Sequence, residues 1–373
     1  MTPSRRILII GGGISGLALA GSRAAAGDSV EVVEMQPEWQ VTSSGITLKP
    51  PALRALDRLG LLPEVEKYGS PHHKFHHCNA AGDLIEEMDP DNLAGGDKPR
   101  VAGILRWDLH NILLKRATEA GAKFTMGETV TNVEDGDDAA TVTFESGRTD
   151  TYDIVVAADG INSMMRDLVT PESAGRPEFT GIAVWRALVP LHPNVDTLTV
   201  FFGKNTAGAN PVSDDQMYVF VMTPMPEPRF IGDDERVAGI TEKLEGFTGT
   251  LADVRAQITD PAQVVVRPIY SVVVKPPWHK GRLVLMGDAV HAPPSTLAQG
   301  GGMAMEDAVV MSEVLDKDIP LEDAYAEYTE RRAPRSAQTV QFTLEHLAAL
   351  REGDGRKAGM IEAKANAALA QAL

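Results

Sequence analysis

The stretch Ile7–Gly16, with the sequence ILIIGGGISG, decides the fold because it joins a buried strand to a glycine turn. The apolar run Ile7–Ile10 is typical of a strand buried on both faces. Gly11, Gly13 and Gly16 then form the pattern G-x-G-x-x-G. In this pattern the first glycine permits a tight turn, the second lets the backbone approach a pyrophosphate, and the third lets the next helix pack against the strand. The stretch therefore predicts a dinucleotide-binding turn.

The residues that follow complete a βαβ unit. The Ala-rich segment Ser15–Ala26 predicts a helix that ends at Gly27, and Ser29–Val33 predicts a second strand. Glu34 follows that strand, at the place where an acidic side chain can bind a ribose hydroxyl. A purely structural glycine turn is the alternative. Strand, turn, helix, strand and acid nevertheless come in the order that dinucleotide binding requires.

Length, charge and cysteine content limit the classes of protein. A chain of 373 residues can bury a sizeable core and is long enough for two domains. Its formal net charge of −17 argues against nonspecific binding to nucleic acid or to an anionic membrane surface. Cys78 is the only cysteine, which excludes an intramolecular disulfide and favours a cytoplasmic location. We expect no transmembrane helix and no secretory signal.

The pattern of elements changes along the chain. An α/β pattern runs to about residue 180, a mostly β segment occupies residues 181–274 with one helix near Asp233–Thr248, and the α/β pattern then resumes. We also expect a hairpin over His72–Met88 and a long helix over Met303–Leu315. The expected division is a cofactor-binding domain of residues 1–71, 98–180 and 275–320, a substrate domain of residues 72–97 and 181–274, and C-terminal helices over residues 321–373.

Two further predicted strands end in acidic motifs. Asp159 and Gly160 follow one of them, and Gly287 and Asp288 follow the other. Ligands of open α/β sheets lie beyond the carboxyl ends of the strands. Each aspartate alone is more typical of a turn or a helix N-cap. Together with Glu34 and the glycine turn, they predict an extended ligand with several hydroxyl groups.

On these motifs the sequence resembles the FAD-dependent aromatic hydroxylases, single-component flavoprotein monooxygenases of the para-hydroxybenzoate and salicylate hydroxylase type. The resemblance extends to about Arg332. It implies an α/β fold, in which a Rossmann-like FAD-binding domain carries an inserted, mostly β substrate domain and C-terminal helices. Further motifs that carry it are Arg106–Leu109, Asp153–Arg166, Gly287–His291, Gln299–Gly302 and Glu306–Ala308.

The resemblance also implies roles for individual residues. The glycine turn would hold the FAD pyrophosphate, Glu34 the adenosine ribose, and Arg106 and Asp288 the pyrophosphate and ribityl regions. Asp159 and Gly160 would contact FAD and the reduced nicotinamide together. The full set expected to bind the cofactor is Gly11, Gly13, Ser15, Gly16, Glu34, Arg106, Val130, Asp159, Gly160, Asp288, Gly300 and Gly301.

One loop departs from the family pattern. Many members have Pro-Pro-x-x-Gly-Gln-Gly after the histidine, whereas this chain has PPSTLAQG over Pro293–Gly300. With the glutamine aligned, Ser295 replaces the second proline and Ala298 replaces a glycine. In the family this loop lies beside the isoalloxazine ring.

The implied activity is a monooxygenase that consumes NADH or NADPH and hydroxylates a small aromatic or N-heteroaromatic compound through a flavin hydroperoxide. Its partners would be that substrate and molecular oxygen, and the chain would be a monomer or a homodimer. Arg186, Tyr218 and Pro294 are the candidate substrate contacts, and Tyr218 and His73 are the candidate catalytic residues. A core tyrosine and an exposed arginine are the alternatives for Tyr218 and Arg186.

The run His72–Cys78 contains four histidines and a cysteine, a composition that suggests a metal site. Lys74 lies among them and no carboxylate is near, so we expect no metal. We expect instead a hairpin that covers the substrate pocket and lends it one histidine.

Other functions remain open at this point. They are an epoxidising or halogenating flavoenzyme, a flavin-binding protein without turnover, and a nicotinamide dehydrogenase. The four tryptophans are scattered along the chain, which disfavours the halogenases. The motifs at Asp159 and Asp288 disfavour the dehydrogenase.

Overall fold

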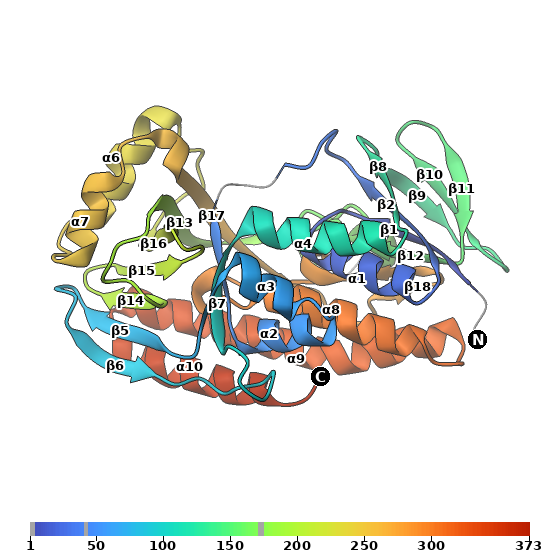
Figure 1. Ribbon diagram of the computed structural model, residues 1–373. Coiled ribbons are helices and arrows are strands. Elements are labelled where there is room, and N and C mark those ends of the chain that lie inside the picture. Colours follow the sequence, from blue (N-terminus) through green and yellow to red (C-terminus); the bar gives the residue numbers. More distant parts are fainter. Residues whose placement is uncertain (1–3, 41–43, 171–174) are drawn as a thin grey trace.

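The computed structural model describes residues 4–40, 44–170 and 175–373. A six-stranded sheet forms the first half of the molecule, on the right in Figure 1, in the order β18-β19-β12-β1-β2-β8. All neighbouring strands are parallel except the edge pair β18 and β19. These strands are β1 (Arg6–Ile10), β2 (Ser29–Glu34), β8 (Lys123–Met126), β12 (Ile154–Ala157), β18 (His279–Lys280) and β19 (Leu283–Leu285).

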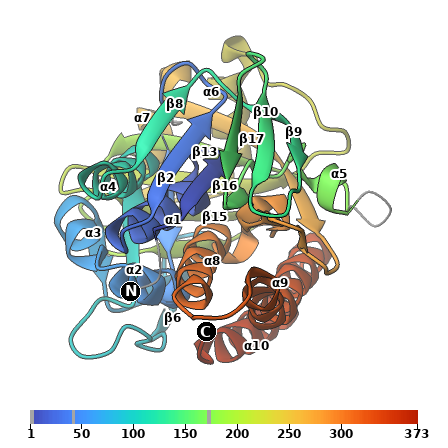
Figure 2. The same ribbon diagram turned by 90° about the vertical axis from the view of Figure 1, so that its right-hand side faces the viewer.

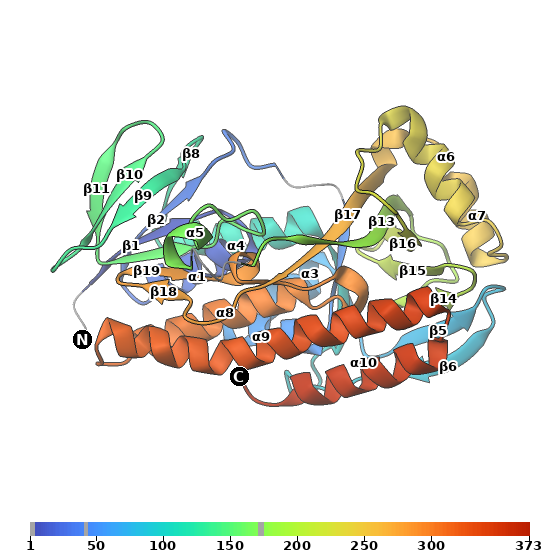
Figure 3. The same cartoon turned by 180° about the vertical axis from the view of Figure 1, so that it is seen from behind.

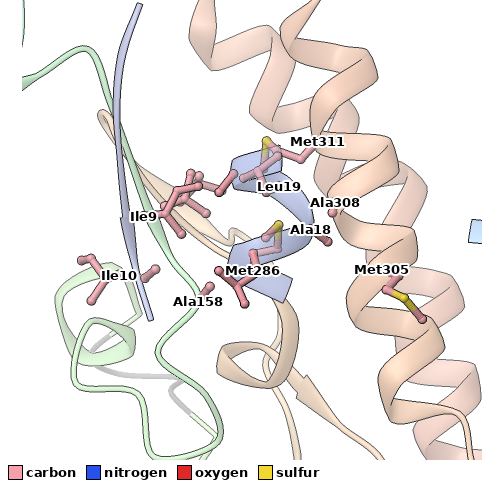
Figure 4. Packing of buried hydrophobic residues seen from close by; sticks show 14 of the residues in the cluster. Ile9, Ile10, Ala18, Leu19, Ala158, Met286, Met305, Ala308 and Met311 are labelled. Atoms are coloured by element: carbon pink, nitrogen blue, oxygen red, sulfur yellow. The ribbon is translucent and has the colours of Figure 1, made fainter. Parts of the chain in front are cut away.

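Helix α1 (Ile14–Ala25) lies between this sheet and helix α8 (Gly300–Leu315), as Figures 2 and 4 show. Ala18 and Leu19 of α1 and Ala308 of α8 are buried in the same core as Ile9. The small alanine side chains let the two helix backbones approach closely. The predicted strand, turn and helix therefore form one packed unit, which fixes the direction of the glycine turn.

An eight-stranded sheet forms the other half, in the order β20-β17-β13-β16-β15-β14-β5-β6. Helices α6 (Asp233–Lys243) and α7 (Thr250–Gln257) contribute to its core, where a single helix is expected from the sequence. Gly246 and Gly249 separate the two helices, and both have positive φ. The strands are β5 (Phe75–Asn79), β6 (Leu84–Met88), β13 (Glu178–Pro190), β14 (Thr199–Phe202), β15 (Thr206–Pro211), β16 (Gln216–Pro224), β17 (Val264–Val273) and β20 (His291–Ala292).

Two smaller sheets and several helices complete the fold. One sheet has the order β3-β7-β4 and the other β11-β10-β9. Their strands are β3 (Gly45–Leu48), β4 (Ser70–His72), β7 (Val101–Leu105), β9 (Val130–Glu134), β10 (Ala140–Phe144) and β11 (Thr149–Tyr152). The remaining short helices are α2 (Pro50–Arg58), α3 (Leu62–Tyr68), α4 (Arg106–Glu119), α5 (Arg166–Val169) and three 3-10 turns over Pro261–Gln263, Gly287–Ala289 and Ser295–Leu297.

The C-terminal segment forms two long helices, as expected. Helix α9 (Leu321–Glu352) runs along both halves of the molecule, and α10 (Gly355–Ala370) folds back against it (Figure 3). The predicted α/β fold, with its mostly β insertion and C-terminal helices, is therefore present. The division into domains at the stated residue numbers stays a prediction. Across residues 4–40, 44–170 and 175–373, no helix has both the length and the apolar character needed to cross a membrane.

The hairpin predicted over His72–Met88 begins three residues later. Strands β5 and β6 pair as expected, but His72 belongs to β4 and pairs with β7. His72 is buried, and its Nε2 has no hydrogen-bond partner among the described residues. Desolvation by this burial lowers the pKa of His72 from 6.5 to about 4.

This burial predicts a pH dependence of stability. Since the folded pKa of His72 lies below the unfolded value, the unfolded chain binds the extra proton first, and stability falls as the pH drops from 6.5 to about 4. Replacing His72 with glutamine should remove up to about 3 kcal/mol of that fall. Urea unfolding of both proteins at several pH values measures it. Parallel curves for both proteins would contradict this assignment.

Candidate active site

A cavity of about 440 Å³ lies where the glycine turn, the eight-stranded sheet and helix α8 meet. Its lining brings together residues that lie far apart in the sequence. The predicted site residues among them are Gly13, Ser15, Arg106, Gly160, Arg186, Tyr218, Asp288, Gly300 and Gly301.

The glycine turn has the geometry of an anion cradle. A Cβ at Gly11 would lie 2.4 Å from the carbonyl oxygen of Ala158, and one at Gly16 would lie 2.1 Å from that of Gly11. A Cβ at Gly13 would meet no atom within 4 Å, so open space lies above this residue. Because α1 begins here without a side-chain cap, its free N–H groups and positive dipole end suit a pyrophosphate.

Glu34 stands beside this turn at the end of β2. Its carboxylate accepts hydrogen bonds from the backbone N–H of Gly12 at 2.9 Å and of Gln36 at 3.0 Å. These bonds fix the carboxylate next to the glycine turn, where the adenosine ribose is expected. Four of the other residues expected to hold FAD lie outside the cavity lining, and they are Gly11, Gly16, Val130 and Asp159.

Of these, Val130 begins β9 and is fully buried in the core. Asp159 caps a turn, because its carboxylate accepts hydrogen bonds from the N–H groups of Met164 and Met165 at 2.9 and 3.3 Å. Burial raises the pKa of Asp159, and its Oδ1 lacks a partner in the described part of the chain. One oxygen therefore serves the turn, and the other is buried without a hydrogen bond to a described residue.

Asp288, in contrast, faces the cavity. Its side chain retains accessible surface there, yet protein surrounds it closely enough that desolvation raises the pKa of its carboxyl group. The backbone beneath it is held by Asp307 of α8, whose Oδ2 accepts hydrogen bonds from the N–H of Gly287 at 2.9 Å and from His291 at 2.7 Å. Helix α8 thus positions the loop that presents Asp288.

Asp307 belongs to a buried ionic network between α8 and α9. Arg332 lies 2.6 Å from Asp307 and 2.9 Å from Glu306, and Arg335 lies 2.8 Å from Glu306. Arg54 of α2 is a third arginine in contact with Glu306, at 3.1 Å. Arg332, Glu306 and Asp307 are fully buried. The network therefore connects helix α9 to the loop of Asp288.

Arg186 and Tyr218 lie on adjacent strands on the sheet side of the cavity. Tyr218 is buried, and its hydroxyl shares a hydrogen bond with Thr47, which also accepts one from Asn210 at 2.9 Å. Burial raises the pKa of Tyr218, so its hydroxyl stays protonated. Arg186 forms no ion pair or side-chain hydrogen bond within the described residues, and desolvation lowers its pKa. A desolvated guanidinium that faces a cavity without a partner suits an anionic ligand.

Two of the predicted contacts lie outside the cavity lining. His73 is exposed and lies outside the cavity lining, because β4 ends at His72 and β5 begins at Phe75. His77 of β5 lines the cavity instead. Pro294 is buried and lies outside the lining, whereas Pro293 lies in it.

The loop that departs from the family pattern precedes α8. Ala298 has φ 54°, a left-handed conformation that favours glycine, which fits the glycine common at this position in the family. Gly300 and Gly301 precede the helix expected over Met303–Leu315, but in the structure they lie in the first turn of α8. In the described ranges, no group of three or more His, Cys, Asp or Glu residues is arranged to hold a metal ion.

The glycine turn, the acid at the end of β2 and the Asp288 loop beyond β19 define a Rossmann-like dinucleotide-binding protein of the flavoprotein class. Residues 5–343 match the model of the family described as "FAD binding domain". The chain belongs to this family. The prediction of FAD as the cofactor and the resemblance to flavoprotein monooxygenases are thereby confirmed.

Individual relatives and solved structures agree with this family assignment. The chain is 33% identical over 344 residues to "Putative FAD-dependent monooxygenase YetM" of Bacillus subtilis, covering 91% of this chain and 92% of the relative. It is 28% identical over 361 residues to 6-hydroxynicotinate 3-monooxygenase of Pseudomonas fluorescens, covering 92% and 91%. Among solved structures, a variant of HpxO from Klebsiella pneumoniae in complex with FAD has a TM-score of 0.83 and 25% identity, covering 98% of this chain and 95% of HpxO.

Proposed function

We propose that the chain is an NADH- or NADPH-dependent monooxygenase that hydroxylates a small aromatic or N-heteroaromatic compound bearing an anionic oxygen. The observation that carries the proposal is the unpaired Arg186 beside Tyr218, in the same cavity as the glycine turn and Asp288. The name of the 6-hydroxynicotinate relative, a carboxylated N-heteroaromatic compound, agrees with this substrate class.

The residues present fit FAD. The open space at Gly13 and the N-terminus of α1 would take the pyrophosphate, Glu34 the ribose, and Arg106 and Asp288 the middle of the cofactor. Gly300 and Gly301 at the start of α8 would lie near the flavin ring. When bound, FAD would supply the redox chemistry, by accepting hydride from NADH or NADPH and activating molecular oxygen.

The chain itself would bind and orient the ring. Arg186 would pair with a phenolate or carboxylate oxygen of the substrate, which favours the electron-rich ionised form that accepts oxygen most readily. Tyr218 would donate its proton in a hydrogen bond to the same substrate. The apolar side chains Val184, Phe220 and Met222 that line the cavity would exclude water from the reacting atoms.

A test of the function measures NADH and NADPH oxidation by the FAD-loaded protein with aromatic acids, phenols and hydroxypyridines. The proposal expects one of these classes to stimulate oxidation and to yield a hydroxylated product. Stimulation without hydroxylation would favour a halogenating or epoxidising enzyme. No stimulation by any class would favour a flavin-binding protein without turnover.

Arg186 should determine affinity for the anionic substrate. Replacing it with glutamine should raise KM about 10- to 100-fold, since a hydrogen bond to a charged group contributes about 1.5–3 kcal/mol. Arg236→Gln on α6 is the matched control, because Arg236 pairs with Asp233 and neither residue lines the cavity. Steady-state kinetics measure both variants. An unchanged KM for Arg186→Gln would remove Arg186 from the substrate site.

A further inference from the structure

A second group of polar side chains lines the same cavity away from the glycine turn. It consists of Lys49, which precedes α2, His77 on β5, His346 on α9 and Glu362 on α10, and we term it the distal polar cluster. Four elements from distant parts of the chain supply one residue each. Neither FAD binding nor the contact with Arg186 uses any of them.

The sheet register separates this cluster from Arg186. Arg186 pairs with Phe220, Phe220 with Gly208, Gly208 with Val200, and Val200 with His77, so all five share one row across the sheet. That row crosses four strand spacings, which corresponds to about 19 Å. Phe220 and Val200 line the cavity between its two polar ends, together with Leu198, Phe202, Met222 and Leu350. The cavity is therefore long, apolar in the middle and polar at both ends.

The charges of the distal polar cluster cancel. Lys49 Nζ lies 3.1 Å from Glu362, with side chains only 9% and 15% exposed, and 4.1 Å from the ring centre of Phe75. For an ion pair with so little solvent contact, the cost of desolvating the two charges offsets much of their attraction. The pair therefore contributes little to the stability of the fold, and stability alone does not explain it. Removing either partner would leave an isolated charge in the cavity wall.

The two imidazoles are free to bind a ligand. Burial lowers the pKa of both His77 and His346, so both are neutral near pH 7. Neither forms a hydrogen bond with another described residue, and Nδ1 of His346 is buried without a partner. A neutral imidazole can both donate and accept a hydrogen bond. A ligand group that does the same would satisfy both rings.

We propose that the substrate is elongated, with its aromatic ring beside Arg186 and an apolar arm that ends in an uncharged hydroxyl or amide bound by His77 and His346. This inference rests on the proposed function. An uncharged end fits because Glu362 already neutralises Lys49. A carboxylate there would lie beside Glu362 and lose its water without gaining a free cation.

Three phenols test the inference on the FAD-loaded protein: 4-hexylphenol, 4-(6-hydroxyhexyl)phenol and 6-(4-hydroxyphenyl)hexanoate. Dissociation constants come from the change in flavin absorbance on binding. We expect the hydroxyhexyl compound to bind at least about five-fold more tightly than the other two, the gain from one net hydrogen bond. His77→Phe and His346→Phe should abolish this preference. His76→Phe should keep it, because His76 lies on the opposite face of β5 and outside the cavity lining.

Other outcomes separate the two proposals. Tighter binding of 4-hexylphenol or of the hexanoate by the unmodified protein would overturn the inference, as would a preference that survives both histidine variants. If none of the three binds while phenol itself stimulates NADH or NADPH oxidation, the inference fails and the proposed function stands. If the preference is present but no aromatic compound stimulates oxidation, the proposed function fails and the elongated site stands.

Discussion

Replacing Arg332 with methionine is expected to lower the free energy of unfolding by about 3–5 kcal/mol, since breaking a buried ion pair leaves an uncompensated charge. Arg332 contacts Glu306 at 2.9 Å and Asp307 at 2.6 Å, and all three side chains are buried. Without Arg332, Glu306 keeps Arg54 and Arg335, whereas Asp307 loses its arginine partner. Guanidinium unfolding of the FAD-free protein measures the change.

The same substitution should also weaken FAD binding. Asp307 accepts the N–H of Gly287 and pairs with His291, on either side of Asp288. A displaced Asp307 would therefore release the loop that presents Asp288 to the cofactor. We expect at least a ten-fold increase in the dissociation constant of FAD, about 1.4 kcal/mol.

Arg331→Met provides the matched control on the same helix. Arg331 is partly exposed and pairs with Glu313 at 2.6 Å. Surface ion pairs contribute at most about 1 kcal/mol, so this variant should stay close to the unmodified protein in both measurements. Equal effects of the two substitutions would contradict the role assigned to the buried network.

Replacing Gly13 with valine should abolish FAD binding and leave the fold intact. Gly13 has an extended backbone with φ −78°, which valine adopts readily, and an added Cβ would meet no protein atom within 4 Å. The added side chain would instead fill the space expected for the pyrophosphate. We expect FAD affinity to fall at least about 100-fold, or 2.7 kcal/mol, measured by equilibrium dialysis.

Gly16→Val separates this effect from simple unfolding. A Cβ at Gly16 would lie 2.1 Å from the carbonyl oxygen of Gly11, so this variant should lose stability as well as FAD. Thermal unfolding of the FAD-free proteins distinguishes the two. If Gly13→Val retains FAD, the pyrophosphate does not lie at this turn. If Gly13→Val loses stability as Gly16→Val does, the fold itself requires a glycine at this position.

The sequence predicts those parts of the site that directly follow a strand in the chain. The glycine turn, Glu34 and Asp288 each follow a strand, and parallel strands bring their carboxyl ends to one edge of a sheet. The apolar runs and their spacing were sufficient to predict this edge. Arg186 and Tyr218 also line the cavity, as expected for substrate contacts, although their roles stay predictions.

The sequence pattern does not predict the position of residues where a strand is interrupted or where a helix begins. A continuous strand over residues 72–78 puts His73 and His77 on one face, but residues 73 and 74 interrupt the strand and leave His73 in solvent. The helix was expected to begin at Met303, after the glycine cluster, but α8 begins at Gly300. Close packing explains a glycine within this first turn, because a Cβ at Gly302 would lie 3.2 Å from Ala52 of α2.

Only one member of the distal polar cluster had a signal in the sequence: His77 belongs to the His72–Cys78 run, whose hairpin was expected to lend one histidine to the pocket. His346 and Glu362 lie in helices whose pattern shows only that they are amphipathic. Their position at the cavity depends on how α9 packs against β17 and β20 and how α10 packs against α9 and α2, which no local spacing encodes. Because their positions depend on long-range packing, local sequence patterns do not predict that these two residues line the cavity.

The most direct test of the proposed function is the origin of the oxygen atom in the product. The compound that best stimulates NADH or NADPH oxidation is converted by the FAD-loaded protein under oxygen gas enriched in the heavy isotope, and the product is analysed by mass spectrometry. A monooxygenase places one labelled oxygen atom in each hydroxylated product molecule. A product without label, or one labelled only when the water is enriched, would contradict the assignment.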